Sequence, residues 1–174
     1  AIEALPQIRP SAAGRVILFL ALNGLRTRTV TLNQMRRYLT ARGIGRHFVF
    51  VLKRLVWLIF GRSRLFQWIL RGVDGLIPTD PRIKNIFDKY RPDLVFTTVA
   101  MFAEMDAEIL REAKRRHVPT VGMSRGWDIY TNSGIMRIVP DKLLVHNRYA
   151  EETAQTHQFI SQSKILRVGF PRND

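Results

Sequence analysis

The chain has 174 residues, of which 46% are apolar, enough to build the core of one domain. It contains no cysteine, which excludes disulfides, thiolate metal sites and cysteine nucleophiles. Its 28 lysine and arginine residues outnumber 14 acidic residues and give a formal net charge of +14. Such an excess indicates a polyanionic partner, and the composition leaves open a nucleic acid, an anionic membrane or a phosphorylated substrate. The longest unbroken apolar run, residues 16–22, is far shorter than the about 20 residues that a membrane-spanning helix needs.

The first part of the chain predicts a tail, a strand, a loop and a helix. Proline and glycine residues mark residues 1–14 as a flexible tail. The apolar run at 15–22 predicts a buried strand, and residues 23–29 predict a polar loop that leaves its end. Apolar residues at positions i, i+3 and i+7 predict a helix over residues 31–43, which Gly43 ends.

Residues 80–94 give the clearest local pattern. Asp80 is a candidate N-cap, and Pro81 suits the first helical position, where a missing N–H costs nothing. The apolar residues that follow recur with helical spacing. Arg91 precedes a proline and therefore ends the helix, because the residue before proline avoids the α region. Residues 94–98 then predict a strand.

The unit of helix and strand repeats through the rest of the chain. Helices are predicted at 105–117 and 148–160, and short apolar strands at 118–123, 142–147 and 164–169. This alternation is typical of βαβ units. We therefore predict an α/β, Rossmann-like domain over residues 15–168, with a parallel sheet and helices on both faces. Ligands of such sheets bind beyond the carboxyl ends of the strands, so the polar connections at 23–28, 97–106, 124–134 and 146–147 are expected to meet at one rim.

Several segments resemble one enzyme family. They read "DPRIKNIFDKYRPDLVFTT", "ILREAKRRHVPTVGMSRGWDIYTNSG", "DKLLVHNRYAEE" and "KILRVGFPRND", and "ILFLALNGLRTRTVTLNQMRRYL" precedes them. From about Arg64 onward, the chain resembles the N-terminal half of bacterial GT-B-type glycosyltransferases and related surface-polysaccharide enzymes. It departs from their pattern by two residues inserted after Ser124 and by Ile129, where asparagine is usual.

The resemblance implies one half of a GT-B architecture, the half that binds the acceptor. Residues 169–174 would begin the linker to a C-terminal domain that binds most of the nucleotide-sugar donor, so this chain alone is expected to be inactive. No cofactor is implied. The sequence also has no Asp-x-Asp motif and no histidine pair at metal-ligand spacing, so we expect no metal site.

Three carboxylates on the expected rim are candidates for the catalytic base: Asp128, Glu104 and Asp106. Each has an alternative structural role, as a turn or helix cap. The expected acceptor-binding residues are Asn23, Arg26, Thr27, Arg28, Thr98, Arg125, Trp127 and His146. For Trp127 the alternative is packing of its loop, and for the arginines it is a solvated turn.

A basic aromatic segment at about 46–71 predicts contact with a membrane. On a continuous helix its basic residues align, tryptophans flank them and aliphatic side chains lie opposite, as in an interfacial helix on an anionic bilayer. The expected membrane-binding residues are Lys53, Arg54, Trp57, Arg64, Trp68 and Arg71. Gly61 is a possible break between two helices. In the alternative, residues 47–52 form a buried strand and the remainder forms core helices.

Together these features predict part of a membrane-associated glycosyltransferase. It would be cytoplasmic, peripheral to the inner face of the membrane, and would act on a lipid-linked or polysaccharide acceptor. A sugar-nucleotide epimerase or hydrolase of the same fold is one alternative. A basic nucleic-acid-binding module is another, although the sequence has no helix-turn-helix, zinc-finger or RNP-like pattern.

Overall fold

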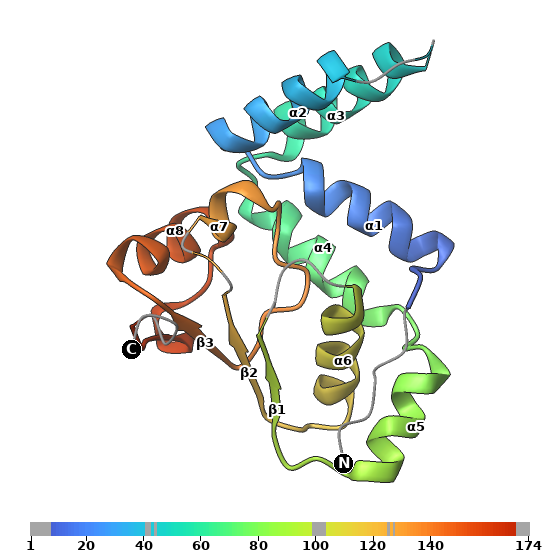
Figure 1. The fold of residues 1–174 in the computed structure, drawn as a ribbon, viewed down its shortest axis with the longest axis vertical. Helices are drawn as coiled ribbons and strands as arrows, with labels where there is room; N and C mark the ends of the chain where they lie inside the picture. The colour runs from blue at the N-terminus through green and yellow to red at the C-terminus, as the bar shows by residue number, and fades with distance from the viewer. Residues whose placement is uncertain are drawn as a thin grey trace.

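The computed structural model describes residues 8–40, 43, 45–98, 104–124, 126 and 128–169 (Figure 1). These residues form an α/β fold in which eight α-helices flank a four-stranded parallel sheet. The strands are β1 (Val95–Thr97), β2 (Thr120–Met123), β3 (Lys142–Val145) and β4 (Ile165–Arg167). They lie in the order β1-β2-β3-β4, and each pairs in parallel with the next. The prediction of a Rossmann-like α/β fold is therefore confirmed, and each strand lies within a predicted one.

The helices between and before these strands follow their local sequence signals. They are α5 (Pro81–Tyr90), α6 (Glu104–Arg115) and α8 (Arg148–Gln158), together with the short α7 (Ile129–Asn132) and a 3-10 turn at Gln162–Lys164. The side chain of Asp80 caps α5 by accepting the N–H of Arg82 at 2.8 Å, and Arg91 ends the helix in the left-handed region with φ of 42°. The predicted start and end of α5 are thus confirmed.

The predicted strand at 15–22 is wrong, because these residues belong to helix α1 (Ala12–Asn23). The hydroxyl of Ser11 caps the helix by accepting the N–H of Gly14 at 3.1 Å. Gly14, Ile17 and Ala21 are buried, and their spacing is that of one helix face. The helix also begins inside the stretch that was predicted as a tail. A short apolar run is ambiguous between helix and strand, and here the cap decides.

Three further helices separate α1 from the α/β unit. They are α2 (Arg28–Thr40), α3 (Arg46–Phe60) and α4 (Arg64–Leu76). The alternative of a strand at 47–52 is wrong, because these residues lie within α3. Gly61 does separate two helices, as the sequence indicated. In Figure 1, α2 and α3 lie side by side at the end of the molecule opposite α5, with α1 and α4 between them and the sheet.

The buried apolar residues form three clusters. The first lies among β3, β4, α7 and α8, and the second among α1, α2, α3, α4 and residue 135. The third joins α5, α6 and β1. Side chains alternate along the strands, so Val95 and Leu143 are buried, whereas Phe96 and Leu166 are 51% and 45% exposed. The described elements thus cover one side of the sheet more fully than the other.

Candidate functional site

The polar connections at 23–28 and 128–134 meet in the structure, as the rim hypothesis predicted. The hydroxyl of Thr27 donates to the carbonyl oxygen of Thr131 at 2.5 Å. Beside this contact, the N–H of Ile135 donates to the carbonyl oxygen of Ala21 at 2.9 Å. The reason for this contact differs in part from the predicted one, because residues 23–28 follow the end of helix α1 and not the end of a strand.

The segment that follows α7 is held by a buried amide. Gln158 of α8 is fully buried, and its side chain accepts the N–H of Met136 at 2.9 Å. The same side chain donates to the carbonyl oxygens of Tyr130 and Gly134 at 2.9 and 2.8 Å. Burial beside this segment raises the pKa of Tyr130 to about 12, so its phenol stays neutral in ordinary buffers. Hydrogen bonds between the Gln158 side chain and backbone groups therefore hold the segment in place. The pattern of side chains in the sequence does not reveal such contacts.

Asp128 lies at the start of α7, and its groups organise that turn. One carboxylate oxygen accepts the side-chain N–H of Asn132 at 2.5 Å, and its carbonyl oxygen accepts the N–H of Thr131 at 3.1 Å. The sequence left capping by this carboxylate as the alternative role, and the Asp128 side chain makes no capping hydrogen bond to the backbone of α7. Asn132, which donates to the Asp128 carboxylate, also lines a cleft between α1, α2 and the end of α7. Arg125 and Trp127 lie outside the described residues.

Glu104 belongs to a buried ionic network. Its carboxylate accepts from Arg137 at 2.6 Å, and Arg137 also donates to Asp74 at 2.7 Å. Asp74 in turn pairs with Arg111, which donates to Glu108 at 2.8 Å. This network joins α4, α6 and the segment before β3, and it occupies the Glu104 carboxylate.

Asp106 is the third candidate base, and it lies in the first turn of α6. It is half-buried, and burial raises the pKa of its carboxyl, a direction that suits a proton acceptor. The hydrogen bonds of the described residues link none of the three candidate carboxylates to another. They therefore do not form a shared acid–base pair.

The remaining predicted acceptor residues divide between the core and the surface. His146 is buried at the end of β3, where its ring nitrogens lie 2.6 Å from the carbonyl oxygen of Ser124 and 3.0 Å from that of Gly169. The guanidinium of Arg26 lies 4.6 Å from the Trp57 ring centre. Arg28 and Thr98 are exposed, at the start of α2 and just after β1. Only Asn23 and Thr27 of this set lie close to one another and to the 128–134 segment.

The predicted membrane-binding residues divide in the same way. Arg64 and Trp68 of α4 are exposed, and Trp68 is 71% exposed. Trp57 is buried, and Arg54 lies over its ring at 3.9 Å. Arg71 donates to the carbonyl oxygens of Met136 and Gln158 at 3.0 and 2.7 Å, and burial lowers its pKa to about 10. The predicted alignment of the basic residues assumed one continuous helix. The break between α3 and α4 at Gly61 removes this alignment.

A cleft of about 390 Å³ opens between α1, α2 and the end of α7. Its apolar wall consists of Leu18, Phe19 and Leu22 from α1 with Val30 from α2. The polar residues that line it are Asn23, Asn33, Gln34, Arg37, Lys53, Asn132 and Ser133. The rim contact between Thr27 and Thr131 therefore forms beside a lined cavity.

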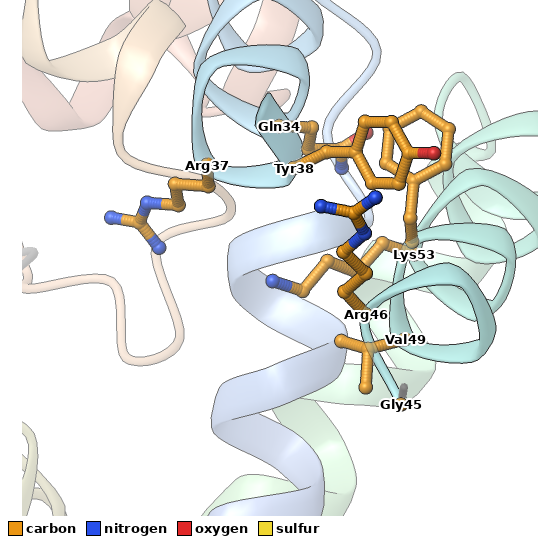
Figure 2. Close-up of a pocket in the computed structure, with 8 residues that line it drawn as sticks. Gln34, Arg37, Tyr38, Gly45, Arg46, Val49 and Lys53 are labelled. Carbon is orange, nitrogen blue, oxygen red and sulfur yellow. The ribbon is translucent and has the colours of Figure 1, made fainter. Parts of the chain in front are cut away.

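A second cleft of about 190 Å³ lies between α2 and α3 and shares three residues with the first: Gln34, Arg37 and Lys53 (Figure 2). In Figure 2, Arg37 and Lys53 extend toward the same side of the helix pair, whereas Arg46 lies under the Tyr38 ring, 5.7 Å from its centre. Gln34, Arg37, Asn132 and Ser133 were not among the predicted site residues. A signal exists for Arg37 alone, in the charge distribution: residues 4–73 contain 13 lysines and arginines and no acidic residue.

Two kinds of site are absent from the described residues. These residues contain no group of three or more histidine or acidic side chains that would hold a metal ion. None of their helices is both long and apolar enough to cross a bilayer. Comparison with protein-family models, curated proteins and solved structures found no match to this chain.

Proposed function

We propose that this chain is the acceptor-side domain of a glycosyltransferase that works at an anionic membrane surface. Its acceptor would be a lipid-linked or polysaccharide glycan, and a separate domain would bind the nucleotide-sugar donor. The sequence resemblance supports the glycosyl-transfer part of this proposal. The surface of α3 and α4 supports the membrane part.

The observation that carries the proposal is an exposed apolar stripe on α3. Phe48, Leu52, Leu55 and Ile59 are 72%, 40%, 47% and 63% exposed. They follow one another at intervals of four, three and four residues and so lie along one line of the helix. Contiguous apolar faces of this kind mark interaction surfaces, because complete burial of a leucine is worth about 1.5–3 kcal/mol and these half-exposed side chains forgo part of it in water.

A second stripe lies on the next helix. The exposed apolar residues of α4 are Leu65, Trp68, Ile69, Val73 and Leu76. Leu65, Trp68 and Leu76 lie on one side of that helix, at intervals of three and eight residues. An exposed tryptophan among aliphatic side chains is typical of the membrane interface.

The charge of the same region supports an anionic surface. Because residues 4–73 have no acidic residue, nearly all of the chain's excess positive charge lies on the segment that contains α1 to α4. Each lysine or arginine near an anionic bilayer contributes about 1 kcal/mol to binding. Apolar stripes and a concentration of cations thus occur on the same helices.

Vesicle flotation tests the membrane part. The protein is expected to float with vesicles that contain phosphatidylglycerol and to float weakly with phosphatidylcholine alone. The double variant Leu52→Gln/Leu55→Gln should weaken partitioning by at least about tenfold, because it removes two side chains from the stripe. The matched control, Leu94→Gln/Leu166→Gln, changes two similarly exposed leucines near the sheet and should float as the wild type does.

Two outcomes would contradict the membrane part. One is the absence of flotation with either vesicle. The other is binding to random DNA that falls steeply with salt, without flotation, which would favour the nucleic-acid module.

Product analysis tests the catalytic part. The protein expressed from its complete reading frame is incubated with membranes and labelled nucleotide sugars. Label transferred to a lipid or glycan fraction supports the proposal. Conversion or hydrolysis of the nucleotide sugar without transfer would instead identify an epimerase or hydrolase.

A further inference from the structure

The two cations that border both clefts have no acidic partner. Neither Arg37 nor Lys53 takes part in any of the ion pairs among the described residues. The nearest acidic residues in the sequence are Glu3 and Asp74. Partial burial and the charge of Arg37 both lower the pKa of Lys53, so the two cations repel one another across the cleft. An anion between them would relieve that repulsion.

A buried amide beside these cations has an unused acceptor. Gln34 is 6% exposed, and its Oε1 has no hydrogen-bond partner. The orientation of the amide follows from its neighbours: Asn23 uses its N–H to bond Phe19, so its Oδ1 requires the N–H of Gln34, at 3.2 Å. The Gln34 oxygen is then left without a donor, in a side chain that lines both clefts. An unpaired buried acceptor costs free energy, which a donor on a ligand would recover.

We propose that the cleft at Gln34, Arg37 and Lys53 binds a phosphate ester that carries a hydroxyl group. The phosphate lies between Arg37 and Lys53, and the hydroxyl donates to Oε1 of Gln34. Asn132 and Ser133, which line the larger cleft, provide further polar contacts.

The apolar wall of the cleft fits a hydrocarbon chain attached to the phosphate. Leu18, Phe19 and Leu22 of α1 and Val30 of α2 line the same cleft as the two cations. Lys53 belongs to α3, the helix whose other side has the apolar stripe. This step rests on the proposed function: at a membrane, the ligand would be the headgroup of an anionic lipid or lipid-linked acceptor. Away from a membrane, a soluble sugar or glycerol phosphate has the same chemistry.

Titration with soluble probes tests the site without vesicles. The probes are glycerol 3-phosphate, methyl phosphate and dihexanoyl phosphatidylglycerol below its micelle concentration, and binding is followed by calorimetry and by NMR of the Gln34 amide. Arg37→Gln/Lys53→Gln should weaken glycerol 3-phosphate binding by at least about tenfold, because two charge-assisted contacts are lost. The control Arg15→Gln/Arg36→Gln makes the same change in net charge on exposed positions of α1 and α2 and should bind as the wild type does.

A third variant tests the hydroxyl contact. The wild type is expected to prefer glycerol 3-phosphate to methyl phosphate, and Gln34→Leu should lose this preference while it still binds methyl phosphate. Tighter binding of the short-chain lipid than of glycerol 3-phosphate identifies a lipid headgroup as the source, and equal or weaker binding identifies a soluble phosphate.

Three results would overturn the site: no binding of any probe, equal weakening in the two double variants, or an unshifted Gln34 amide at saturation. Flotation without probe binding would refute this site and leave the membrane proposal standing. Probe binding without flotation would refute the membrane proposal and leave this site standing.

Discussion

Thr27 and Thr131 are 104 residues apart in sequence and are joined by a hydrogen bond of 2.5 Å from the Thr27 hydroxyl to the Thr131 carbonyl oxygen. The same hydroxyl accepts the N–H of Val30 at 3.2 Å, in the first turn of α2. One buried side chain therefore fixes α2 to the segment that follows β2. The larger cleft lies between these two elements, so its width depends on this contact.

Replacement of Thr27 by valine should loosen this connection. Thr27→Val keeps the shape of the side chain but removes both hydrogen bonds, and we expect the free energy of unfolding to fall by about 1–2 kcal/mol. Denaturant unfolding measures the loss of stability. The control is Thr29→Val, at an exposed position in the first turn of α2. An unchanged stability in Thr27→Val would show that the contact does not hold α2 in place.

Gly134 permits a second contact of the same segment, from Ile135 to the carbonyl oxygen of Ala21 in α1. Its φ is +83°, and a Cβ at this position would lie 2.4 Å from the carbonyl oxygen of Ala21. Gly134→Ala should therefore destabilise the protein by more than about 1 kcal/mol. Gly72→Ala is the matched control, since Gly72 lies within α4 with open space around it and should stabilise the helix by about 0.5–1 kcal/mol. Equal effects of the two variants on thermal unfolding would contradict this account.

Asp74 is the centre of the buried ionic network. It is fully buried and accepts from both Arg111 and Arg137, at 3.0 and 2.7 Å. Asp74→Asn leaves two buried cations without their shared partner, and we expect a loss of about 3–5 kcal/mol. Asp88→Asn removes one partner of an exposed pair and should have a much smaller effect. A similar loss of stability in both variants would argue against the network.

Asp141 should make stability depend on pH in the acid range. Burial raises the pKa of its carboxyl, but hydrogen bonds from Thr120 and the nearby Lys114 ammonium outweigh burial, so the pKa lies below the ordinary 3.8. A depressed folded-state pKa contributes stability that is complete above the unfolded value and is lost as pH falls through the folded value.

The difference between the wild type and Asp141→Asn should therefore shrink as pH falls below about 4. Unfolding at a series of pH values measures it. A difference that stays constant across the acid range would show that Asp141 contributes no pH dependence.

The sequence predicted the α/β half well because its signals there are local. Asp80, Pro81 and Arg91 determine α5 through a cap, a fixed φ and a steric restriction, and none of these needs tertiary information. Residues 16–22 were misassigned because a short apolar run has no period that separates helix from strand, and Ser11 was not recognised as a cap.

The site was predicted less well because its geometry depends on packing. The prediction that Arg64 and Arg71 align with the basic residues before Gly61 assumed one helix that continues through Gly61. The structure has two helices, and Arg71 of α4 lies in the interior, where it donates to the carbonyl oxygen of Gln158. Gln34 and Arg37 lie in a helix with no motif, and only the packing of α2 against α3 and α7 makes them line a cleft. The contact between residues 27 and 131 agrees with the prediction that their loops lie together. The predicted reason is wrong for residues 23–28, because they follow helix α1 and not a strand.

Site-specific fluorescence at α3 tests the central claim most directly. Because the chain has no cysteine, Leu55→Cys and Leu94→Cys each introduce a single site for an environment-sensitive label, at side chains 47% and 56% exposed. With vesicles that contain phosphatidylglycerol, the label at residue 55 should shift to the blue and be quenched by brominated lipid chains, while the label at residue 94 should not change. Labels that respond alike, or a label at 55 that stays in water while vesicles bind, would contradict the assignment of α3 to the membrane surface.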